Sequence, residues 1–285
     1  MYKGKYPMIY LFDTSGINRL HDDPDCDAIA TGLVSTNEVW ISALNVAEVG
    51  QTSEHSRRMS LLHLLKVLTR GRRPLEFPTI LIQRGIEAYS KRLPSIDISI
   101  SENSEDIWQV MIDPTLLDEA AMSKWSQPLR EFEEKFLATH RSARPHFQNL
   151  FAKGEPSPKS AVELLRAFAS KETFLHDTVN PIYKNVVGTD LPVTETMHLL
   201  QALPQLTGFL LAWGHSIYCR SIARSGYGAR NAGNVDIWFG AYLAQVDRFV
   251  TNDLKQFQAL RLVARMFAPK CEILRYDSFR RRLVI

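Results

Sequence analysis

The sequence predicts an α/β fold, in which a central parallel β-sheet is flanked by helices and interrupted by an all-helical insertion. Two observations lead to this prediction. Short apolar runs alternate with helix-like segments near both ends of the chain, a pattern typical of parallel sheets covered on both faces. Between them, residues 96–205 carry helical periodicity and no convincing strand. The 285 residues suffice for one large domain with such an insertion.

The N-terminal part, residues 1–95, begins with an apolar run at 8–12, which predicts a buried strand that ends in a turn over residues 13–16. A second strand is expected at residues 38–42. Helical spacing follows, and a glycine and a proline break the chain at 71–74. The helices expected in this part cover residues 43–52, 56–68 and 78–92, the last with Pro78 near its start.

The C-terminal part, residues 206–285, resumes the alternation of helices and strands. Helices are expected at residues 233–245 and 253–266, and strands at 248–251 and 271–274. The middle of the chain has four helix-like segments, at residues 104–112, 114–139, 160–171 and 194–223. We therefore expect one α/β domain formed by the two ends of the chain, with residues 96–205 as a helical insertion.

The composition excludes several classes of protein. Cys26, Cys219 and Cys271 are odd in number and form no C-x-x-C pair, which argues against a disulfide framework or a thiolate zinc site and fits a reducing cytosol. No segment approaches the ~18 uncharged apolar residues of a membrane helix. The first residues lack the apolar core of a signal peptide, because Asp13 interrupts the apolar run early. A soluble, cytoplasmic protein without membrane partners is therefore expected.

The net charge of +3 conceals an uneven distribution. Residues 1–95 hold 12 basic and 10 acidic side chains, residues 96–205 hold 10 and 16, and residues 206–285 hold 12 and 5. The two ends are therefore basic and the insertion is acidic. A basic surface suits a polyanionic substrate, although such an imbalance often reflects solubility alone.

Four carboxylates follow or open elements that meet at one edge of the predicted sheet: Asp13, Glu48, Asp236 and Asp253. Ligands of parallel sheets bind beyond the carboxyl ends of the strands. Asp13 directly follows the first strand, and Asp253 follows the strand at 248–251 after one asparagine. Crowded carboxylates repel one another, and a hard cation removes that repulsion. Oxygen ligands suit Mg²⁺ or Mn²⁺, which can activate water for attack on a phosphodiester.

Each of these acids also has a purely structural interpretation as a cap or favourable charge at the start of a helix or turn. The alternatives are Asp13 capping the turn at Thr14 and Ser15, Asn45 with Glu48 as a capping-box variant, Asp236 at a helix N-terminus, and Asn252 with Asp253 as an N-cap. Any one acid is explained well in this way. The alternatives explain less well why all four fall at the same edge.

Four short segments in order resemble the PIN-domain nucleases: residues 9–15 (IYLFDTS), 41–48 (ISALNVAE), 234–238 (NVDIW) and 249–253 (FVTND). The resemblance covers roughly residues 1–95 and 206–285. It implies a PIN-like central parallel sheet with Asp13 on the first strand and Glu48 on the next helical layer. It further implies that the four acids bind Mg²⁺ or Mn²⁺ and support endonuclease cleavage, mostly of RNA. Secondary polar contacts are implied from Thr14 or Ser15 and from Asn252.

The glycine-rich segment 225–234 precedes Asp236 and predicts a mobile loop. Arg230, Tyr227 and Asn234 in this loop are candidates for substrate contacts, and a plain connector is an equally good interpretation. No Gly-Lys-Ser/Thr follows, so a nucleotide-binding P-loop is not indicated. Further clusters could bind backbone phosphate: Arg57 and Arg58, residues 70–73, and residues 280–282, the last equally well a solvated tail.

Other acids are rival candidates for the site. Asp247 precedes a strand and so belongs to the opposite edge of the sheet, whereas Asp277 follows the last strand and could be a peripheral ligand. The acidic run of Asp22, Asp23, Asp25 and Asp27 is expected to be exposed to solvent.

The sequence therefore predicts a metal-dependent endoribonuclease, with DNA as a possible substrate. The alternative is a catalytically degenerate nucleic-acid-binding or assembly protein whose helical insertion binds a partner. Typical PIN domains are compact and lack this insertion, which could act as a substrate clamp, a lid, an oligomerisation arm or a built-in inhibitor. An inhibitory protein partner and a homo-oligomer are both compatible with the sequence.

Overall fold

The computed structural model describes residues 7–94, 105–117, 134, 160–219 and 236–283. Its four strands form one sheet in the order β2-β1-β3-β4, and all neighbours are parallel. The strands are β1 (Ile9–Phe12), β2 (Glu38–Trp40), β3 (Arg248–Thr251) and β4 (Glu272–Arg275). A parallel bridge between Ser42 and Leu75 extends the sheet by one residue beyond β2. The predicted α/β class is therefore confirmed.

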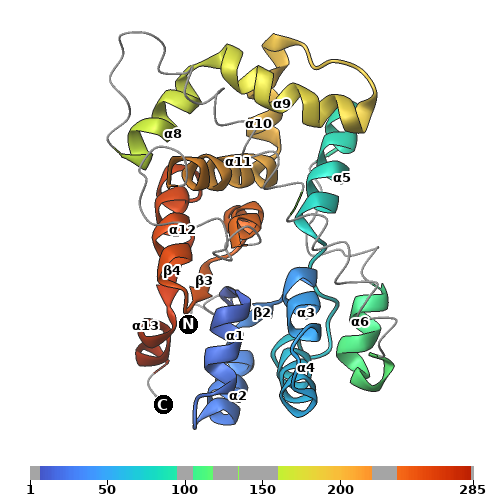
Figure 1. Ribbon diagram of the computed structural model, residues 1–285, viewed down its shortest axis with the longest axis vertical. Coiled ribbons are helices and arrows are strands. Elements are labelled where there is room, and N and C mark those ends of the chain that lie inside the picture. The colour runs from blue at the N-terminus through green and yellow to red at the C-terminus, as the bar shows by residue number, and fades with distance from the viewer. Residues whose placement is uncertain (1–6, 95–104, 118–133, 135–159, 220–235, 284–285) are drawn as a thin grey trace, which may run out of the picture.

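Side chains of each strand alternate between two hydrophobic clusters on opposite faces of the sheet. Leu11 and Phe249 belong to one cluster, whereas Phe12 and Val250 belong to the other. The first face is covered by α12 (Leu254–Phe267) and the 3₁₀ helix η4 (Asp236–Gln245), and α11 (Pro204–Ile217) packs against both. The second face is covered by α1 (Thr14–His21), α2 (Cys26–Thr36), α4 (His55–Thr69) and α13 (Tyr276–Arg282) (Figure 1).

Local sequence signals explain where the helices near the sheet begin and end. Helix α3 (Ala43–Gly50) starts with a capping box, in which Ser42 and Asn45 each bond the other's backbone N–H. Helix α5 (Pro78–Ser90) has its proline at the first position, where the missing N–H costs nothing. Helix α4 ends at Arg70 in the left-handed conformation (φ 53°).

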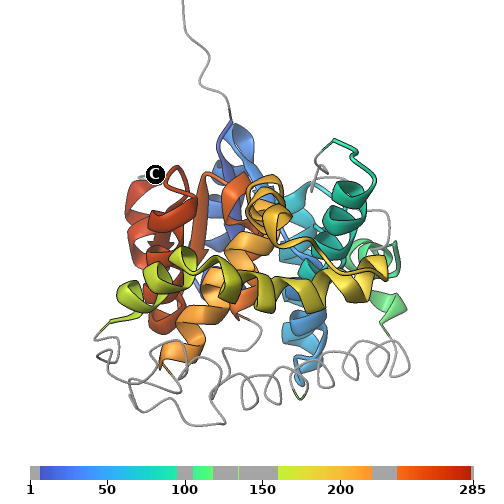
Figure 2. The same cartoon turned by 90° about the horizontal axis from the view of Figure 1, so that it is seen from above.

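The described helices of the middle segment are α6 (Glu105–Ile112), η1 (Pro114–Leu116), α8 (Ala161–Ser170), α9 (Glu172–Val187), η2 (Val193–Glu195) and α10 (Thr196–Ala202). Figures 1 and 2 show α8 and α9 following one another across one end of the molecule, beside α11. Leu165 of α8 and Val179 of α9 belong to the same hydrophobic cluster as Leu11 of the sheet. The division into three segments stays a prediction, because residues 118–133 and 135–159 are not described.

Several expected boundaries are wrong. The turn expected at residues 13–16 is the start of helix α1, and part of the acidic run opens α2. The described part of the helix-like segment 194–223 contains two helices, α10 and α11, because Pro204 opens a new one. Helices α2, α9 and α13 were not predicted. Residues 236–245 form a 3₁₀ helix, and of the segment 114–139 the described part is η1 with residues 117 and 134.

No helix in the described part of the chain is long and apolar enough to cross a membrane.

Candidate active site

The sheet has a topological switch point between β1 and β3. After β1 the chain passes to α1 on one face, and after β3 it passes to α12 on the opposite face. Such divergence opens a crevice beyond the carboxyl ends of the two strands, where ligands of open α/β sheets bind. Asp13 directly follows β1, and Asp253 lies two residues after β3. The topology therefore places both carboxylates at this crevice.

Asp13 is almost fully buried, with 2% of its surface exposed, and both of its carboxyl oxygens are engaged. Oδ1 accepts the backbone N–H of Gly16 at 2.6 Å, so the side chain caps α1. Oδ2 lies 2.7 Å from the hydroxyl oxygens of both Ser15 and Thr251. Burial raises the pKa of Asp13 to about 7, although these hydrogen bonds lower it; the negative charge of Glu48 raises it further.

The Thr251 hydroxyl lies between two acceptors, 2.7 Å from Asp13 Oδ2 and 2.8 Å from Gln256 Oε1. It also accepts the backbone N–H of Asp253 at 3.0 Å. One hydroxyl has a single proton to donate, so it cannot satisfy both acceptors. A protonated Asp13 carboxyl removes the conflict by donating to Thr251, which is consistent with its raised pKa.

Ser15 ties the start of α1 to the loop after β3. Its hydroxyl donates to Asp13 and accepts the backbone N–H groups of Asn252 at 2.9 Å and Asp253 at 3.0 Å. Asp253 in turn caps α12, because its Oδ1 accepts the N–H groups of Lys255 at 2.6 Å and Gln256 at 2.8 Å. A single hydroxyl thus fixes the relative position of the two N-capping aspartates.

Glu48 reaches the same region from α3. Its carboxylate accepts the hydroxyl of Thr14, whose oxygen also accepts Asn45 Nδ2 at 3.2 Å. Asn45 is itself buried and held by Ser42 through the capping box. Glu48 is therefore oriented toward the first turn of α1, beside Asp13, where its negative charge raises the pKa of Asp13.

Asp236 is the first residue of η4, and its backbone carbonyl accepts Gln256 Nε2 at 3.4 Å. Gln256 thereby connects Asp236 to Thr251 and, through Thr251, to Asp13. All four predicted acids thus belong to elements that meet at one edge. Among the described residues, however, no three acidic, histidine or cysteine side chains lie close enough together to hold a metal ion.

The structural interpretation of these acids is partly correct. Asp13 and Asp253 are N-caps, as that interpretation requires. The capping box proposed for Asn45 and Glu48 is wrong, since the partner of Asn45 is Ser42 and Glu48 contacts Thr14. Glu48 therefore does not take the capping-box role that this interpretation gave it.

The predicted substrate contacts fall into two groups. Thr14 and Ser15 use their hydroxyls to hold Glu48 and Asp13, and Asn252 donates its backbone N–H to Ser15. Arg230, Tyr227 and Asn234 lie outside the described residues.

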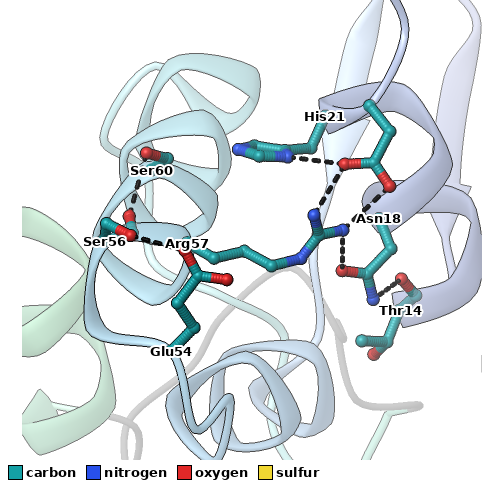
Figure 3. Close-up of polar contacts among 8 residues, drawn as sticks. Thr14, Asn18, His21, Glu54, Ser56, Arg57 and Ser60 are labelled. Carbon is teal, nitrogen blue, oxygen red and sulfur yellow. Dashed lines mark hydrogen bonds and ion pairs between the residues drawn. The ribbon is translucent and has the colours of Figure 1, made fainter.

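The basic clusters are largely occupied by ion pairs. Arg57 of α4 spans the gap to α1, where it bonds Asp22 at 2.8 and 2.9 Å and Asn18 at 3.3 Å (Figure 3). This contact lowers the pKa of Asp22 to about 2. The other pairs join Arg72 to Glu38, Arg73 to Glu105, Arg280 to Asp23 and Asp25, and Arg282 to Glu272. Part of the positive charge of these clusters is therefore balanced by acidic side chains of the chain itself.

The expectation that the whole acidic run is exposed is wrong at Asp23, which has 5% of its surface exposed. Its Oδ2 accepts the Tyr276 hydroxyl at 3.0 Å and Arg280 Nε at 2.8 Å. The charges of the predicted tail at 280–282 are therefore partly used to close the C-terminal helix onto the turn between α1 and α2, rather than being solvated.

Sequence reasoning missed two polar residues that organise this edge. Gln256 is buried and stands three residues after Asp253, the spacing of a capping box, which was a readable signal. Glu76, at the edge of the sheet beyond Leu75, is 1% exposed, and its Oε1 lies 3.9 Å from Arg84. No pattern in the sequence distinguishes Glu76 from a surface acid.

Comparison with protein-family models, with curated proteins and with solved structures found no match to this chain. The arguments for function therefore rest on the geometry and chemistry of the site.

Proposed function

We propose that the protein is a Mg²⁺- or Mn²⁺-dependent endoribonuclease with a PIN-like fold, whose site is formed by Asp13, Glu48, Asp236 and Asp253. The observation that carries the proposal is the buried Asp13 carboxyl at the switch point, linked through shared hydroxyls to the Asp253 loop and lying next to Glu48. Capping alone does not call for a second carboxylate beside a buried one.

The chemistry of these donors suits a hard divalent cation. Carboxylate oxygens are the preferred ligands of Mg²⁺ and Mn²⁺, and a cation offsets the repulsion that raises the pKa of Asp13. When bound, such an ion supplies an activated water and stabilises the leaving oxygen of a phosphodiester. Because no ready group of three ligands exists among the described residues, binding requires the carboxylates to move closer together.

The residues around the acids supply positioning. Ser15 and Thr251 hold Asp13, and Thr14 holds Glu48, so three hydroxyls from two elements orient two carboxylates. Partners of this kind orient metal ligands, and their loss costs about 10–100-fold in affinity or activity.

The test is cleavage of labelled single-stranded RNA and DNA by purified protein, with Mn²⁺ or with EDTA. Wild-type protein is expected to cleave RNA only with metal. Asp13→Asn and Glu48→Gln are expected to lower the rate by more than the roughly 100-fold upper range for an outer-shell partner. Asp27→Asn, which removes an exposed acid from α2, is the matched control and keeps full activity. Cleavage by folded Asp13→Asn at the wild-type rate would remove Asp13 from the site.

A second function, that of a catalytically degenerate nucleic-acid-binding or assembly protein, is favoured by one observation. Asp13 and Asp253 already cap helices, and no three-ligand group exists in the described part of the chain. In that case Mn²⁺ leaves the melting temperature unchanged and no substrate is cleaved. The helical segment at residues 96–205 is then the place to look for a protein partner or a second copy of the chain.

A further inference from the structure

Arg275 ends β4 at the same edge of the sheet as the carboxylates. Its register partner in the neighbouring strand is Thr251, the residue whose hydroxyl lies 2.7 Å from Asp13. Neighbouring strands lie about 4.8 Å apart, and paired residues project to the same face. Arg275 therefore stands one strand away from the carboxylate site, on the side of Thr251.

The Nε atom of the Arg275 guanidinium is buried and has no hydrogen-bond acceptor in the described part of the chain. Several other arginines of the described part form ion pairs with acidic side chains, namely Arg57, Arg72, Arg73, Arg248, Arg280 and Arg282. A buried donor without an acceptor carries a desolvation cost, so its presence at this edge calls for a ligand.

The missing partner is best explained as an anion from outside the chain. Asp13 and Asp253 lie on the adjacent elements, yet neither pairs with Arg275. Both carboxyl oxygens of Asp13 and Oδ1 of Asp253 are engaged by hydroxyls or backbone N–H groups. A guanidinium presents a planar fork of donors that matches two oxygens of a phosphate. We propose that Arg275 binds a backbone phosphate of the nucleic acid next to the carboxylate site; this inference rests on the proposed function.

The arrangement gives the site two neighbouring regions of opposite charge. The carboxylates would hold the cation next to the scissile phosphate, and Arg275 would hold a flanking phosphate. This placement orients the nucleic-acid strand along the carboxyl edge of the sheet, from β1 across β3 toward β4. The phosphate contact reads no base, so it contributes affinity and register without sequence preference.

The inference is tested by binding fluorescein-labelled single-stranded RNA in EDTA, measured by fluorescence anisotropy at several KCl concentrations. Arg275→Gln is expected to weaken binding about tenfold, as loss of a charged hydrogen bond does. The negative slope of the log association constant against log KCl concentration is expected to become shallower by about 0.7, the value for one phosphate contact on a single strand. Arg265→Gln removes an exposed charge from the last turn of α12 and serves as the matched control.

Arg275→Lys keeps the charge and loses the fork. It is expected to keep the salt slope while binding RNA more weakly than wild type, and it replaces the glutamine variant if that protein does not fold by circular dichroism. Arg275 variants that bind like wild type, or like Arg265→Gln, would overturn the inference and leave the nuclease proposal standing. Wild-type protein that neither binds RNA nor cleaves it with Mn²⁺ would overturn both.

Discussion

At the scale of single residues, the question is why an aspartate stands at a cap that other residues fill as well. Serine, threonine and asparagine cap helices about as effectively as aspartate. They do so without a buried carboxyl, whereas burial raises the pKa of Asp13 to about 7. The buried carboxyl of Asp13 therefore carries a desolvation cost that capping does not require. A shifted pKa at a switch point is typical of a functional group.

A second buried titratable group, His215 of α11, provides a test that is independent of the site. Burial lowers its pKa from 6.5 to about 4. Between these values the unfolded chain binds a proton that the folded chain does not, so the free energy of unfolding falls as the pH falls from about 6.5 to 4. The stability from this source is fully present above pH 6.5.

His215→Gln is expected to remove this part of the pH dependence. Between pH 7.5 and pH 5 the wild-type protein should lose on the order of 1–2 kcal/mol more unfolding free energy than the variant. Urea unfolding at the two pH values measures this difference. Equal losses in both proteins would mean that His215 is protonated in the folded state at pH 5.

At the scale of elements, the strands were predictable because buried parallel strands are short apolar runs flanked by turn residues. Of the three helices that were missed, α2 and α13 have charged residues in or beside their first turns, and their apolar faces are short. The 3₁₀ form of η4 was not predictable, because residues 237–243 are all buried and show no periodic polar face that could distinguish a 3₁₀ helix from an α-helix. The segment packs closely against α11.

That packing depends on two glycines whose backbones touch. A Cβ atom on Gly208 would lie 2.1 Å from the carbonyl oxygen of Gly240, and one on Gly240 would lie 2.6 Å from that of Gly208. The close approach also brings the rings of Phe209 and Trp238 into stacking at 4.1 Å. Neither side can yield, since the obstructing atoms are backbone.

Gly208→Ala is therefore expected to destabilise the protein by about 3 kcal/mol or more, the upper range for overpacking. Gly32→Ala in α2 is the matched control, because a Cβ there meets nothing within 4 Å. It is expected to be neutral or to stabilise by up to about 1 kcal/mol through helix propensity. Denaturant unfolding compares the two. Similar effects of both substitutions would show that α11 and η4 can separate without cost.

At the scale of the whole molecule, topology explains what the sequence could say about the site. Asp13 and Asp253 follow strands, and carboxyl ends of parallel strands share an edge, so their common location was predictable. The hydroxyl contacts of Ser15 and Thr251 were not, because the acceptor that a hydroxyl chooses depends on rotamers and on the relative position of α1 and β3. The pairing of the basic clusters likewise depends on tertiary contacts.

Whether the helical segment within residues 96–205 folds independently of the sheet is also a question about the whole molecule. Leu165 of α8 is fully buried and belongs to one continuous hydrophobic cluster with Leu11 and Phe249 of the sheet. Helix α8 packs against α11, which in turn packs against η4 and α12. Because the cluster is continuous, loss of packing in α8 is expected to weaken the sheet as well.

Leu165→Ala is expected to lower the free energy of unfolding by about 2–5 kcal/mol, as other buried leucine truncations do. Hydrogen exchange measured on peptides from β1 and β3 should accelerate in proportion, because those amides open only when the shared cluster opens. Leu93→Ala, which truncates a leucine that is 57% exposed, controls for the loss of apolar surface. If Leu165→Ala accelerates exchange in α8 and α9 while the strands keep wild-type protection, the helical segment folds as a separate unit. If exchange accelerates together in the strands and in α8 and α9, the two regions share one stability. Any partner that bound these helices would then also change the stability of the carboxylate edge.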